Sequence, residues 1–479
     1  MTRTDTTERP TPPTATPTAA DGVPFTRLPL PPAVQANLQQ LGYAVMTPIQ
    51  AMSLPWSLAG HDLIAQAKTG SGKTAAFALP LLHRLDSRRF AVQALVLCPT
   101  RELAEQVTQE IRRLARAEDN IKTLTLCGGV PLRNQVASLA HGAHIVVGTP
   151  GRIVDHLSRG TLTLDALNTL VLDEADRMLD MGFADDMAQV MRACPPQRQT
   201  LLFSATYPDG VAQLAGRFMR EPKEVRLTDT HAVHKIRQRF YPVDEHTRLH
   251  AVGLLLNHFR PASTLAFCNT KQRCRDLVAV LQAQGVVALA LHGDLDQRER
   301  DQVLVQFANR SCSVLVATDV AARGLDIAQL EAVINVDITP DPEVHTHRIG
   351  RTGRADGDGW AFSLASVDDM GSVGRIDQMQ GHESAWHPLS ELAAPTDAPP
   401  LEPPMVTLQI VGGRKEKIRA GDVLGALTKD LGLRGEQIGK INVNEFSTYV
   451  AVQRQVADKA LQGLNSGKVK GKTVKARRL

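Results

Sequence analysis

Short apolar runs separated by longer amphipathic stretches recur through most of this chain of 479 residues. The first group comprises DLIAQA (62–67), ALVLC (94–98), IVVG (145–148), TLVL (169–172) and TLLF (200–203), and the second comprises TLAF (264–267), VLVA (314–317) and AVINV (332–336). Apolar runs of this length that alternate with helical segments are typical of parallel strands buried on both faces. The pattern therefore predicts an α/β fold with two parallel sheets in tandem.

Two stretches lack this pattern and mark the expected joints between domains. The segment REPKEVRLTDTHAVHK (220–235) is polar and aperiodic, whereas LSELAAPTDAPPLEPP (389–404) is dense in Ala and Pro and should be extended. The expected organisation is a first α/β domain over 25–226, a linker over 227–235, a second α/β domain over 236–383, a Pro/Ala-rich linker over 384–404 and a small domain over 405–479.

The N-terminus and the cysteines restrict the kind of protein. Residues 1–24 are rich in Thr, Pro and Ala and have no apolar core, which predicts a disordered segment and not a secretory signal. No apolar run reaches the roughly 18 residues that a membrane span requires. The six cysteines are scattered and form no C-x-x-C pair, which favours a reducing compartment with no disulfide or zinc site. We expect a cytoplasmic protein with no membrane partner.

The last seventy-five residues have a different pattern. VTLQIV, KINV, TYVAV and KTVKA resemble strands, and two helical segments lie between them, which gives the order β-α-β-β-α-β of the ferredoxin-like α+β fold. Alternation in the last strand should turn Val474 and Ala476 toward the helices and Lys475 and Arg477 toward the open face. The inward positions expected in the helices are Val423, Leu424, Leu427 and Leu431 in the first, and Val456, Ala460, Leu461 and Leu464 in the second.

The positive charge of the chain is concentrated in this same segment. From Met405 onward there are 15 Lys and Arg residues against 6 Asp and Glu residues, although the net charge of the whole chain is only +4. Such localisation indicates a polyanionic partner, but a solvated surface that promotes solubility explains it equally well. The charge alone leaves both interpretations open.

A glycine-rich turn follows the first predicted strand. AKTGSGKT (67–74) departs from the P-loop pattern only in that Ala67 replaces the first glycine. In such a loop, backbone N–H groups and a helix N-terminus surround phosphates. Lys73 would reach the β- and γ-phosphates of ATP, and the Thr74 hydroxyl would bind Mg²⁺. The predicted ATP-binding residues of the loop are Lys68, Thr69, Gly70, Ser71, Gly72, Lys73 and Thr74.

Two further motifs complete a nucleotide-hydrolysing site. In TLVLDEAD, Asp173 lies at the carboxyl end of an apolar strand, where a carboxylate can hold Mg²⁺, partly through water. Glu174 can then orient or deprotonate the attacking water.

In HRIGRTGRAD (347–356), Arg351 and Arg354 are three residues apart and are candidate arginine fingers for the γ-phosphate. The alternative explanation for Asp173 and Glu174 is a solvated turn, and that for the arginine motif is a basic surface loop. The P-loop upstream favours a nucleotide site over both.

These motifs resemble those of the DEAD-box RNA helicases in their order and in their amino-acid sequences. Phe25 with GYAVMTPIQ, AKTGSGKT, PTRELA, the glycine pair 128–129, TPGR, DEAD, SAT, ATDVAARGLDI and HRIGRTGR span about residues 25 to 383. The resemblance implies two RecA-like domains that bind ATP and RNA, and local unwinding of short RNA duplexes. Met46 stands where most family members have proline.

The resemblance also implies roles for individual residues. Gln50 would read the adenine edge, Phe25 would stack on the base and Asp326 would contact the ribose. Ser204, Thr206 and His347 would couple the ATP and RNA sites. The implied contacts with the RNA backbone are Arg101, Gly129, Thr149, Arg152, Gln297, Arg300 and Thr318.

The C-terminal segment is similar to the RNA-binding domain of the DbpA-like subgroup, in LQIVGGRKEKIRAGDVLGAL, IGKI, YVAV and SGKVKGKTVKAR. This similarity implies binding of a hairpin in large-subunit ribosomal RNA and a role in ribosome assembly with pre-ribosomal particles. RNA-recognition modules stack bases on aromatic residues of their central strands. Only Tyr449 is available for this here, so we expect phosphate contacts from Lys470, Lys472, Lys475 and Arg477 to dominate.

Two other function classes compete with an RNA helicase. An RNA clamp or chaperone would hold RNA without needing turnover, and RNA-stimulated ATPase activity would distinguish it from a helicase. A DNA motor would respond to DNA, whereas a site that reads the 2′-hydroxyl should reject it. The remaining histidines carry no functional prediction.

Overall fold

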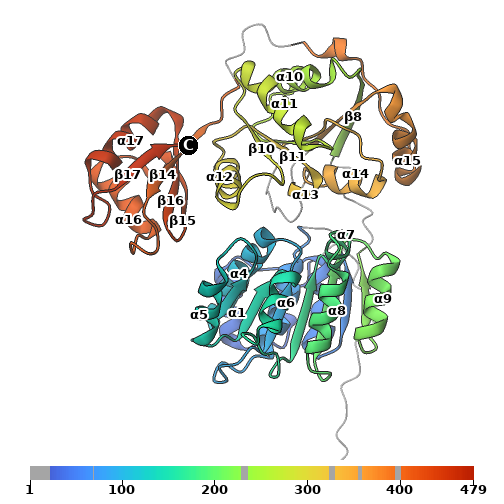
Figure 1. The fold of residues 1–479 in the computed structure, drawn as a ribbon, viewed down its shortest axis with the longest axis vertical. Coiled ribbons are helices and arrows are strands. Elements are labelled where there is room, and N and C mark those ends of the chain that lie inside the picture. Colours follow the sequence, from blue (N-terminus) through green and yellow to red (C-terminus); the bar gives the residue numbers. More distant parts are fainter. Residues whose placement is uncertain (1–21, 68–69, 228–235, 323–329, 354–358, 394–400) are drawn as a thin grey trace, which may run out of the picture. The chain divides into compact units, whose positions relative to one another are not determined.

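The computed structural model describes residues 22–67, 70–227, 236–322, 330–353, 359–393 and 401–479. These residues belong to two compact units, divided between positions 228 and 229. One parallel sheet forms the centre of the first unit, and the second unit contains a parallel sheet and a smaller antiparallel sheet (Figure 1). The predicted fold class, two RecA-like parallel-sheet domains followed by a small α+β domain, is confirmed.

The first RecA-like domain is built on a seven-stranded parallel sheet in the order β3-β4-β2-β5-β6-β1-β7. Its strands are β1 (Leu63–Gln66), β2 (Ala94–Leu97), β3 (Thr123–Leu126), β4 (Ile145–Gly148), β5 (Thr169–Asp173), β6 (Gln199–Ser204) and β7 (Lys223–Arg226). Its α-helices are α1 (Pro32–Gln40), α2 (Pro48–Leu58), α3 (Lys73–His83), α4 (Arg101–Leu114), α5 (Leu132–Ala140), α6 (Pro150–Ser158), α7 (Ala175–Asp180), α8 (Ala184–Ala193) and α9 (Asp209–Phe218). Separate apolar clusters lie on the two faces of the sheet, so it is buried on both.

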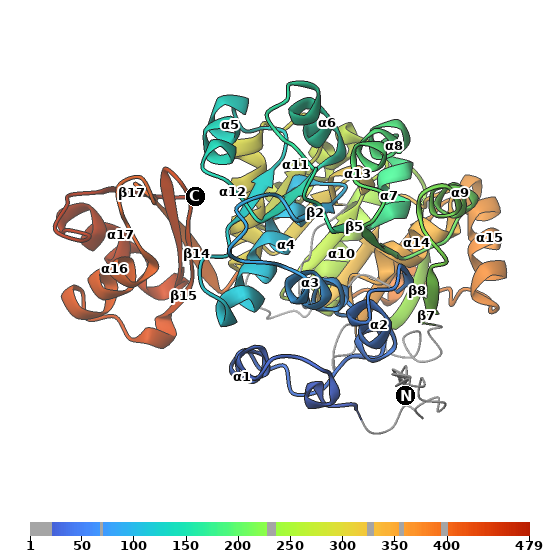
Figure 2. The same ribbon diagram turned by 90° about the horizontal axis from the view of Figure 1, so that it is seen from below.

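The second RecA-like domain contains a six-stranded parallel sheet in the order β10-β11-β9-β12-β13-β8. Its strands are β8 (Ile236–Pro242), β9 (Thr264–Phe267), β10 (Ala288–Leu291), β11 (Val314–Ala317), β12 (Ala332–Asn335) and β13 (Gly359–Ala365). Its α-helices are α10 (Arg248–Phe259), α11 (Lys271–Ala283), α12 (Gln297–Ala308), α13 (Asp319–Ala322), α14 (Pro342–Ile349) and α15 (Met370–Gln380). Figure 2 shows several of these helices from a second direction.

The small domain has an antiparallel sheet in the order β15-β16-β14-β17, which is the predicted ferredoxin-like arrangement. Its elements are β14 (Met405–Val411), α16 (Ala420–Gly425), β15 (Ile438–Val443), β16 (Ser447–Gln453), α17 (Ala457–Ser466) and β17 (Lys475–Arg478). Val474 and Ala476 pack with the helices as expected. Leu424 does not, because it is 41% exposed. A π-helical turn over Ala426–Asp430 continues α16 and changes the helical period, which a regular 3.6-residue pattern does not anticipate.

The apolar runs located eight strands correctly and missed five others in the two parallel sheets. Four of the missed strands, β3, β7, β8 and β10, are the outermost strands of their sheets. An edge strand is less completely buried, so its sequence contains more polar residues, as in KEVR of β7. The fifth, β13, lies next to an edge strand.

Part of the predicted Pro/Ala-rich linker belongs to the second RecA-like domain. The backbone N–H of Phe240 donates to the carbonyl oxygen of Ala385, and Leu392 is buried in the core of this domain. Glu391 accepts hydrogen bonds from Arg239 and Tyr241 at 3.1 and 2.9 Å. The linker prediction over 384–404 is therefore wrong for 384–393, because apolar side chains within this Ala- and Pro-rich stretch pack on the sheet.

All six cysteines are free and buried. Within the described part of the chain, no helix combines the length and the apolar character that a bilayer span needs.

The second RecA-like domain is expected to lose stability in mild acid because of His345. This residue is fully buried, and burial together with the nearby Arg348 charge lowers its pKa to about 4. Between this value and the ordinary pKa near 6.5, the unfolded chain binds the extra proton, so stability falls as the pH falls. We expect His345 to make the domain about 2 kcal/mol less stable at pH 5 than at pH 7.

Urea unfolding followed by tryptophan fluorescence in a Trp56→Phe background measures this effect, because Trp360 and Trp386 then report on the second domain alone. His345→Phe removes the titrating group and should reduce the pH dependence by that amount. An unchanged pH dependence in His345→Phe would assign it to other groups.

Candidate nucleotide and RNA sites

The P-loop lies between β1 and α3, and its conformation depends on glycine. Gly70 and Gly72 have φ values of 84° and 93°, in the region that favours glycine. A Cβ atom on Gly72 would lie 2.6 Å from Nε2 of Gln50 and 2.9 Å from Oγ1 of Thr47. Gly72 directly precedes α3, so Lys73 and Thr74 form the first turn of this helix. Lys68 and Thr69 lie outside the described residues.

Gln50, the predicted adenine reader, connects the start of α2 with the P-loop. Its Nε2 atom donates to the Gly72 carbonyl oxygen at 3.0 Å, and its Oε1 atom accepts from the Thr47 backbone N–H at 2.9 Å. A change at the adenine edge can therefore reach the phosphate-binding loop through one side chain.

The segment before α2 shows how the chain accommodates Met46 in place of proline. The Met46 backbone N–H donates to the Val23 carbonyl oxygen at 2.8 Å, which a proline cannot do, and its side chain is buried in the core. Phe25 is only 3% exposed and its ring meets Tyr43 edge-on. Stacking of Phe25 on a base therefore requires its present neighbours to move.

Lys73 and Asp173 are buried charged residues, and each has one polar atom that no described group satisfies. Lys73 is 6% exposed and Asp173 is 3% exposed, and neither Nζ of Lys73 nor Oδ1 of Asp173 has a hydrogen-bond partner among the described residues. Burial raises the pKa of Asp173 to about 7, although the Lys73 charge opposes this shift. Buried charges without partners are costly, and a polyphosphate with a divalent cation would satisfy both.

The same groups fit Mg²⁺ chemically. Asp173 and Thr74 supply oxygen ligands, which this cation prefers, and Mg²⁺ usually retains several waters. The described residues contain no cluster of three or more His, Cys, Asp or Glu side chains that could hold a metal alone.

Glu174 occupies an unusual backbone conformation at the carboxyl end of β5. It has φ 54° and ψ 53°, the left-handed region, and it caps the N-terminus of α7. Non-glycine residues in this region are uncommon and occur preferentially at functional sites. Glu174 is 5% exposed and directly follows Asp173, which suits the predicted role in orienting water.

The predicted coupling residues contact Asp176, a residue that the sequence interpretation did not select. Oγ1 and the backbone N–H of Thr206 donate to Oδ2 of Asp176 at 2.8 and 2.9 Å. The Asp176 backbone N–H donates to Oγ of Ser204 at 3.2 Å. Burial raises the pKa of Asp176, but the Thr206 hydrogen bonds together with the Lys73 and Arg177 charges outweigh burial and keep this pKa below its usual value. The carboxylate therefore connects the SAT segment firmly to α7.

The predicted RNA contacts of the first domain follow the carboxyl ends of β2, β3 and β4. Nη1 of Arg152 donates to the Val130 carbonyl oxygen at 3.0 Å, which places its side chain beside the glycine pair containing Gly129. Thr149 precedes α6, and Arg101 begins α4 with an ion pair to Glu105. Gly129 is exposed and the three side chains are partly exposed, as backbone-binding groups should be.

Gln135 and His156 hold Arg152 in place, and neither was predicted. Oε1 of Gln135 accepts from Nη1 of Arg152 at 2.8 Å and lies 2.9 Å from Nε2 of His156. Nε2 of Gln135 donates to the Cys127 carbonyl oxygen at 2.8 Å. Burial lowers the pKa of His156. A histidine without a recognisable motif thus contributes indirectly to the predicted RNA surface.

In the second domain, the predicted RNA contacts come from α12 and the end of β11. Gln297 begins α12, and Nη2 of Arg300 donates to the Ala321 carbonyl oxygen at 2.7 Å. Thr318 immediately precedes α13 and accepts at its carbonyl oxygen from the Ala322 N–H. Arg300 and Thr318 therefore lie beside α13, and Gln297 lies three residues before Arg300 on α12.

The histidine–arginine motif lies on α14 and the turn after it. His347 and Arg351 are partly exposed, whereas Arg348 is 2% exposed and hydrogen-bonded within the domain. Arg348 is therefore unavailable as an arginine finger. Arg354 and Asp326 lie outside the described residues.

The four basic residues predicted to bind RNA in the small domain occupy two places. Nζ of Lys470 donates to the Lys417 carbonyl oxygen at 2.6 Å, and Nζ of Lys472 donates to that of Glu416 at 3.3 Å, so both support the loop before α16. Lys475 and Arg477 are exposed on β17. Tyr449 is only 3% exposed, so stacking of a base on its ring requires its present neighbours to move, as for Phe25.

Family models match three consecutive parts of the chain. Residues 47–214 match the DEAD/DEAH box helicase model, 247–356 the helicase conserved C-terminal domain and 407–478 the DbpA RNA binding domain. The chain is 53% identical over 451 residues to ATP-dependent RNA helicase DbpA of Escherichia coli (strain K12), covering 94% of this chain and 98% of that protein. This chain belongs to the DbpA-like DEAD-box RNA helicases.

Other relatives of this helicase share its two RecA-like domains. ATP-dependent RNA helicase CshA of Listeria monocytogenes is 42% identical over 373 residues, which cover 78% of this chain and 71% of the relative. A solved structure of S. cerevisiae Dbp5 bound to RNA and ADP BeF3 matches with a TM-score of 0.70 and 31% identity, over 77% of this chain and 96% of that one. Membership of the family means that this helicase hydrolyses ATP in an RNA-dependent manner.

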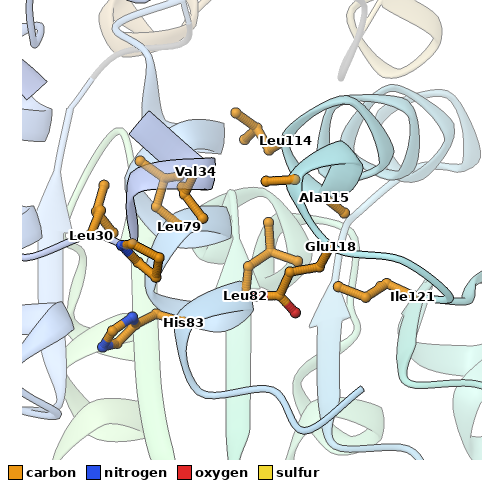
Figure 3. Close-up of a pocket in the computed structure, with 11 residues that line it drawn as sticks. Leu30, Val34, Leu79, Leu82, His83, Leu114, Ala115, Glu118 and Ile121 are labelled. Atoms are coloured by element: carbon orange, nitrogen blue, oxygen red, sulfur yellow. The ribbon is translucent and has the colours of Figure 1, made fainter. Parts of the chain in front are cut away.

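An apolar pocket in the first domain of the helicase lies apart from these sites. It has a volume of about 150 Å³ and is lined mainly by residues of α1, α3 and the end of α4, including Val34, Leu82 and Leu114 (Figure 3). His83, at the opposite end of α3 from the P-loop, also lines it. The pocket therefore has no part in the nucleotide site.

Proposed function

We propose that this helicase remodels a hairpin region of large-subunit ribosomal RNA during ribosome assembly, in the cytoplasm. The observation that carries the proposal is the folded small domain, which matches the DbpA RNA binding domain and holds a large excess of positive charge. A folded basic domain can select one RNA structure, whereas the RecA-like core contacts the backbone of any strand. The small domain would select the RNA, and the RecA-like core would unwind it with ATP.

In the core, this proposal assigns ATP and Mg²⁺ to the unsatisfied groups around the P-loop. Lys73 and the loop N–H groups would hold the phosphates, and Thr74 and Asp173 would hold Mg²⁺, partly through water. Mg²⁺ would neutralise the charge of the phosphates. Glu174 would accept the proton of the attacking water, and Arg351 would stabilise the charge that develops on the γ-phosphate.

RNA would bind to the grouped contacts of both RecA-like domains. Gly129, Thr149 and Arg152 present one backbone-binding surface, and Gln297, Arg300 and Thr318 present another. Binding of ATP and RNA together would favour closure of the two domains, bending of one strand and loss of its partner. Hydrolysis would then allow reopening.

The decisive experiment compares ATPase stimulation by fragments of large-subunit ribosomal RNA with stimulation by unrelated RNA of equal length. Half-maximal stimulation should need less of one ribosomal fragment than of any unrelated RNA, and matched DNA should stimulate poorly. Equal stimulation by all RNAs would refute ribosomal targeting. RNA binding without stimulated turnover would instead indicate a clamp.

Deletion of residues 405–479 should separate selection from turnover. The truncated enzyme should retain RNA-stimulated ATPase activity, at higher RNA concentration, because the core residues are unchanged. Its preference for the cognate fragment should disappear. Deletion of residues 1–21 is the control and should leave that preference intact. A truncated enzyme that still prefers the cognate fragment would show that the core carries the selectivity.

Lys475→Ala should flatten the salt dependence of binding to the cognate RNA fragment. One lost phosphate contact changes the log–log slope by about 0.7–0.9. Lys459→Ala is the control, because Lys459 is an equally exposed lysine on α17, away from the open face of the sheet. Equal slopes for Lys475→Ala and the unmodified protein would remove Lys475 from the RNA surface.

A further inference from the structure

The short helix α13 is held from both sides by buried or partly buried arginines. Arg348 of α14 donates from Nε to Oδ1 and from Nη2 to Oδ2 of Asp319, both at 2.7 Å, and Asp319 is the first residue of α13. At its other end, Arg300 of α12 donates to the carbonyl oxygen of Ala321 at 2.7 Å. Bidentate arginine–carboxylate contacts fix orientation as well as distance.

Arg348 has no freedom to leave this position. Its side chain is 1% exposed and lies over the Phe267 ring, with the guanidinium carbon 5.1 Å from the ring centroid. Beyond Asp319, it donates to the Asp337 carbonyl oxygen at 2.7 Å and to Oδ1 of Asn269 at 2.9 Å. α13 and α14 are therefore locked together at the carboxyl ends of the central strands.

Asp319 and Arg348 lie in the sequence next to a predicted RNA contact and close to a predicted ATP contact, respectively. Thr318, a predicted RNA contact, directly precedes Asp319. Arg351, the predicted arginine finger, follows Arg348 by three residues, and its backbone N–H donates to the Arg348 carbonyl oxygen at 3.2 Å. A displacement of Thr318 by RNA thus reaches Arg351 through one side-chain pair and one backbone hydrogen bond.

We propose that Asp319 and Arg348 are positioning residues that couple RNA binding at Thr318 and Arg300 to the placement of Arg351 at ATP. The inference rests on the proposed roles of these three ligand contacts. Coupling between two sites is a free energy that appears as the ratio of RNA affinities with and without nucleotide. A residue that only stabilises the fold would lower stability without changing this ratio.

The test measures RNA affinity in the presence and absence of a non-hydrolysable ATP analogue, with the full chain and a single-stranded RNA. Asp319→Asn keeps the size of the side chain but removes its charge, and Arg348→Lys keeps the charge but removes the bidentate geometry. Each variant should lose most of the coupling, which is typically about 5- to 150-fold, while RNA affinity without nucleotide changes less than about twofold. The double variant should lose little more than either single variant.

The chain offers a matched control in Arg248 and Asp369. Arg248 is equally buried in the same domain, donates to the Val336 and Leu364 carbonyl oxygens at 2.9 and 3.0 Å, and pairs with Asp369 at 2.9 Å. Within the described part of the chain, neither residue of this pair is hydrogen-bonded to α13. Asp369→Asn and Arg248→Lys should reduce thermal stability similarly but keep the coupling ratio of the unmodified protein.

The outcomes separate the inference from the proposed function. If the unmodified protein shows no effect of nucleotide on RNA affinity, the proposed function itself fails. If it does and Asp319→Asn keeps the full ratio, the inference fails alone. The coupling role would also be overturned if the Arg248→Lys and Asp369→Asn controls lost the ratio of RNA affinities with and without nucleotide. Any loss of stability would then be enough to abolish coupling. Should Arg348→Lys not fold, Asp319→Asn decides.

Discussion

Replacing Glu174 with glutamine should leave ATP and RNA binding nearly unchanged and reduce ATP hydrolysis almost to background. Glutamine has the same shape, so it can occupy the left-handed position at the start of α7 as glutamate does. An amide can still hold the attacking water but cannot accept its proton. The variant should therefore accumulate with ATP and RNA bound, and single-turnover hydrolysis combined with RNA-binding measurements would detect this state.

Glu224→Gln is a suitable control for this substitution. Its side chain is exposed and pairs only with Arg226 on the surface of β7, at 2.9 Å. Loss of this ion pair should not affect turnover. Hydrolysis by Glu174→Gln at the rate of the unmodified enzyme would exclude Glu174 as the base and direct attention to a water held by other groups.

Arg351→Ala should lower RNA-stimulated ATP turnover by about 10³-fold, the lower end for arginine fingers. Arg354→Ala should act in the same direction if both arginines reach the γ-phosphate. Both residues belong to the second RecA-like domain, whereas the P-loop belongs to the first. ATP affinity without RNA should therefore change little, because a finger acts on charge that develops during transfer.

Arg375→Ala provides the comparison for general loss of positive charge. Arg375 is an exposed arginine of α15 in the same domain, and its Nε atom donates only to the Pro340 carbonyl oxygen and its Nη2 atom to Ser372. This variant should turn over ATP normally. A collapse of ATP affinity in Arg351→Ala without RNA would show that Arg351 binds the ground state, and its assignment as a finger would be abandoned.

Prediction from the sequence succeeded where a strand can be recognised from its own segment. Central strands such as β2 and β11 are continuous apolar runs because both faces are covered, so they could be recognised directly. Edge strands such as β7 could not, because their pairing depends on a distant strand. The π-helical turn after α16 and the exposure of Leu424 likewise depend on packing within the small domain.

The candidate site shows the same division. Lys73, Asp173 and Glu174 were found because motif and strand position place them together. Gln135 and His156 were missed, because their relevance comes from hydrogen bonds to Arg152 across 17 residues and to each other across 21 residues. The burial of Arg348 was also unpredictable, since its acceptors come from three separate segments.

The attachment of residues 384–393 to the second RecA-like domain limits the distance over which the helicase can act. Ala393 is bound at one end, through His258, and Pro403 is bound at the other, through Arg454. Only nine residues, 394–402, separate these anchors, and a chain of that length spans at most about 30 Å. If the small domain holds an RNA hairpin as proposed, a segment of this length gives the core a high effective concentration near that hairpin and keeps it away from distant duplexes. Geometry, in addition to affinity, would then decide which helix of a large RNA is opened.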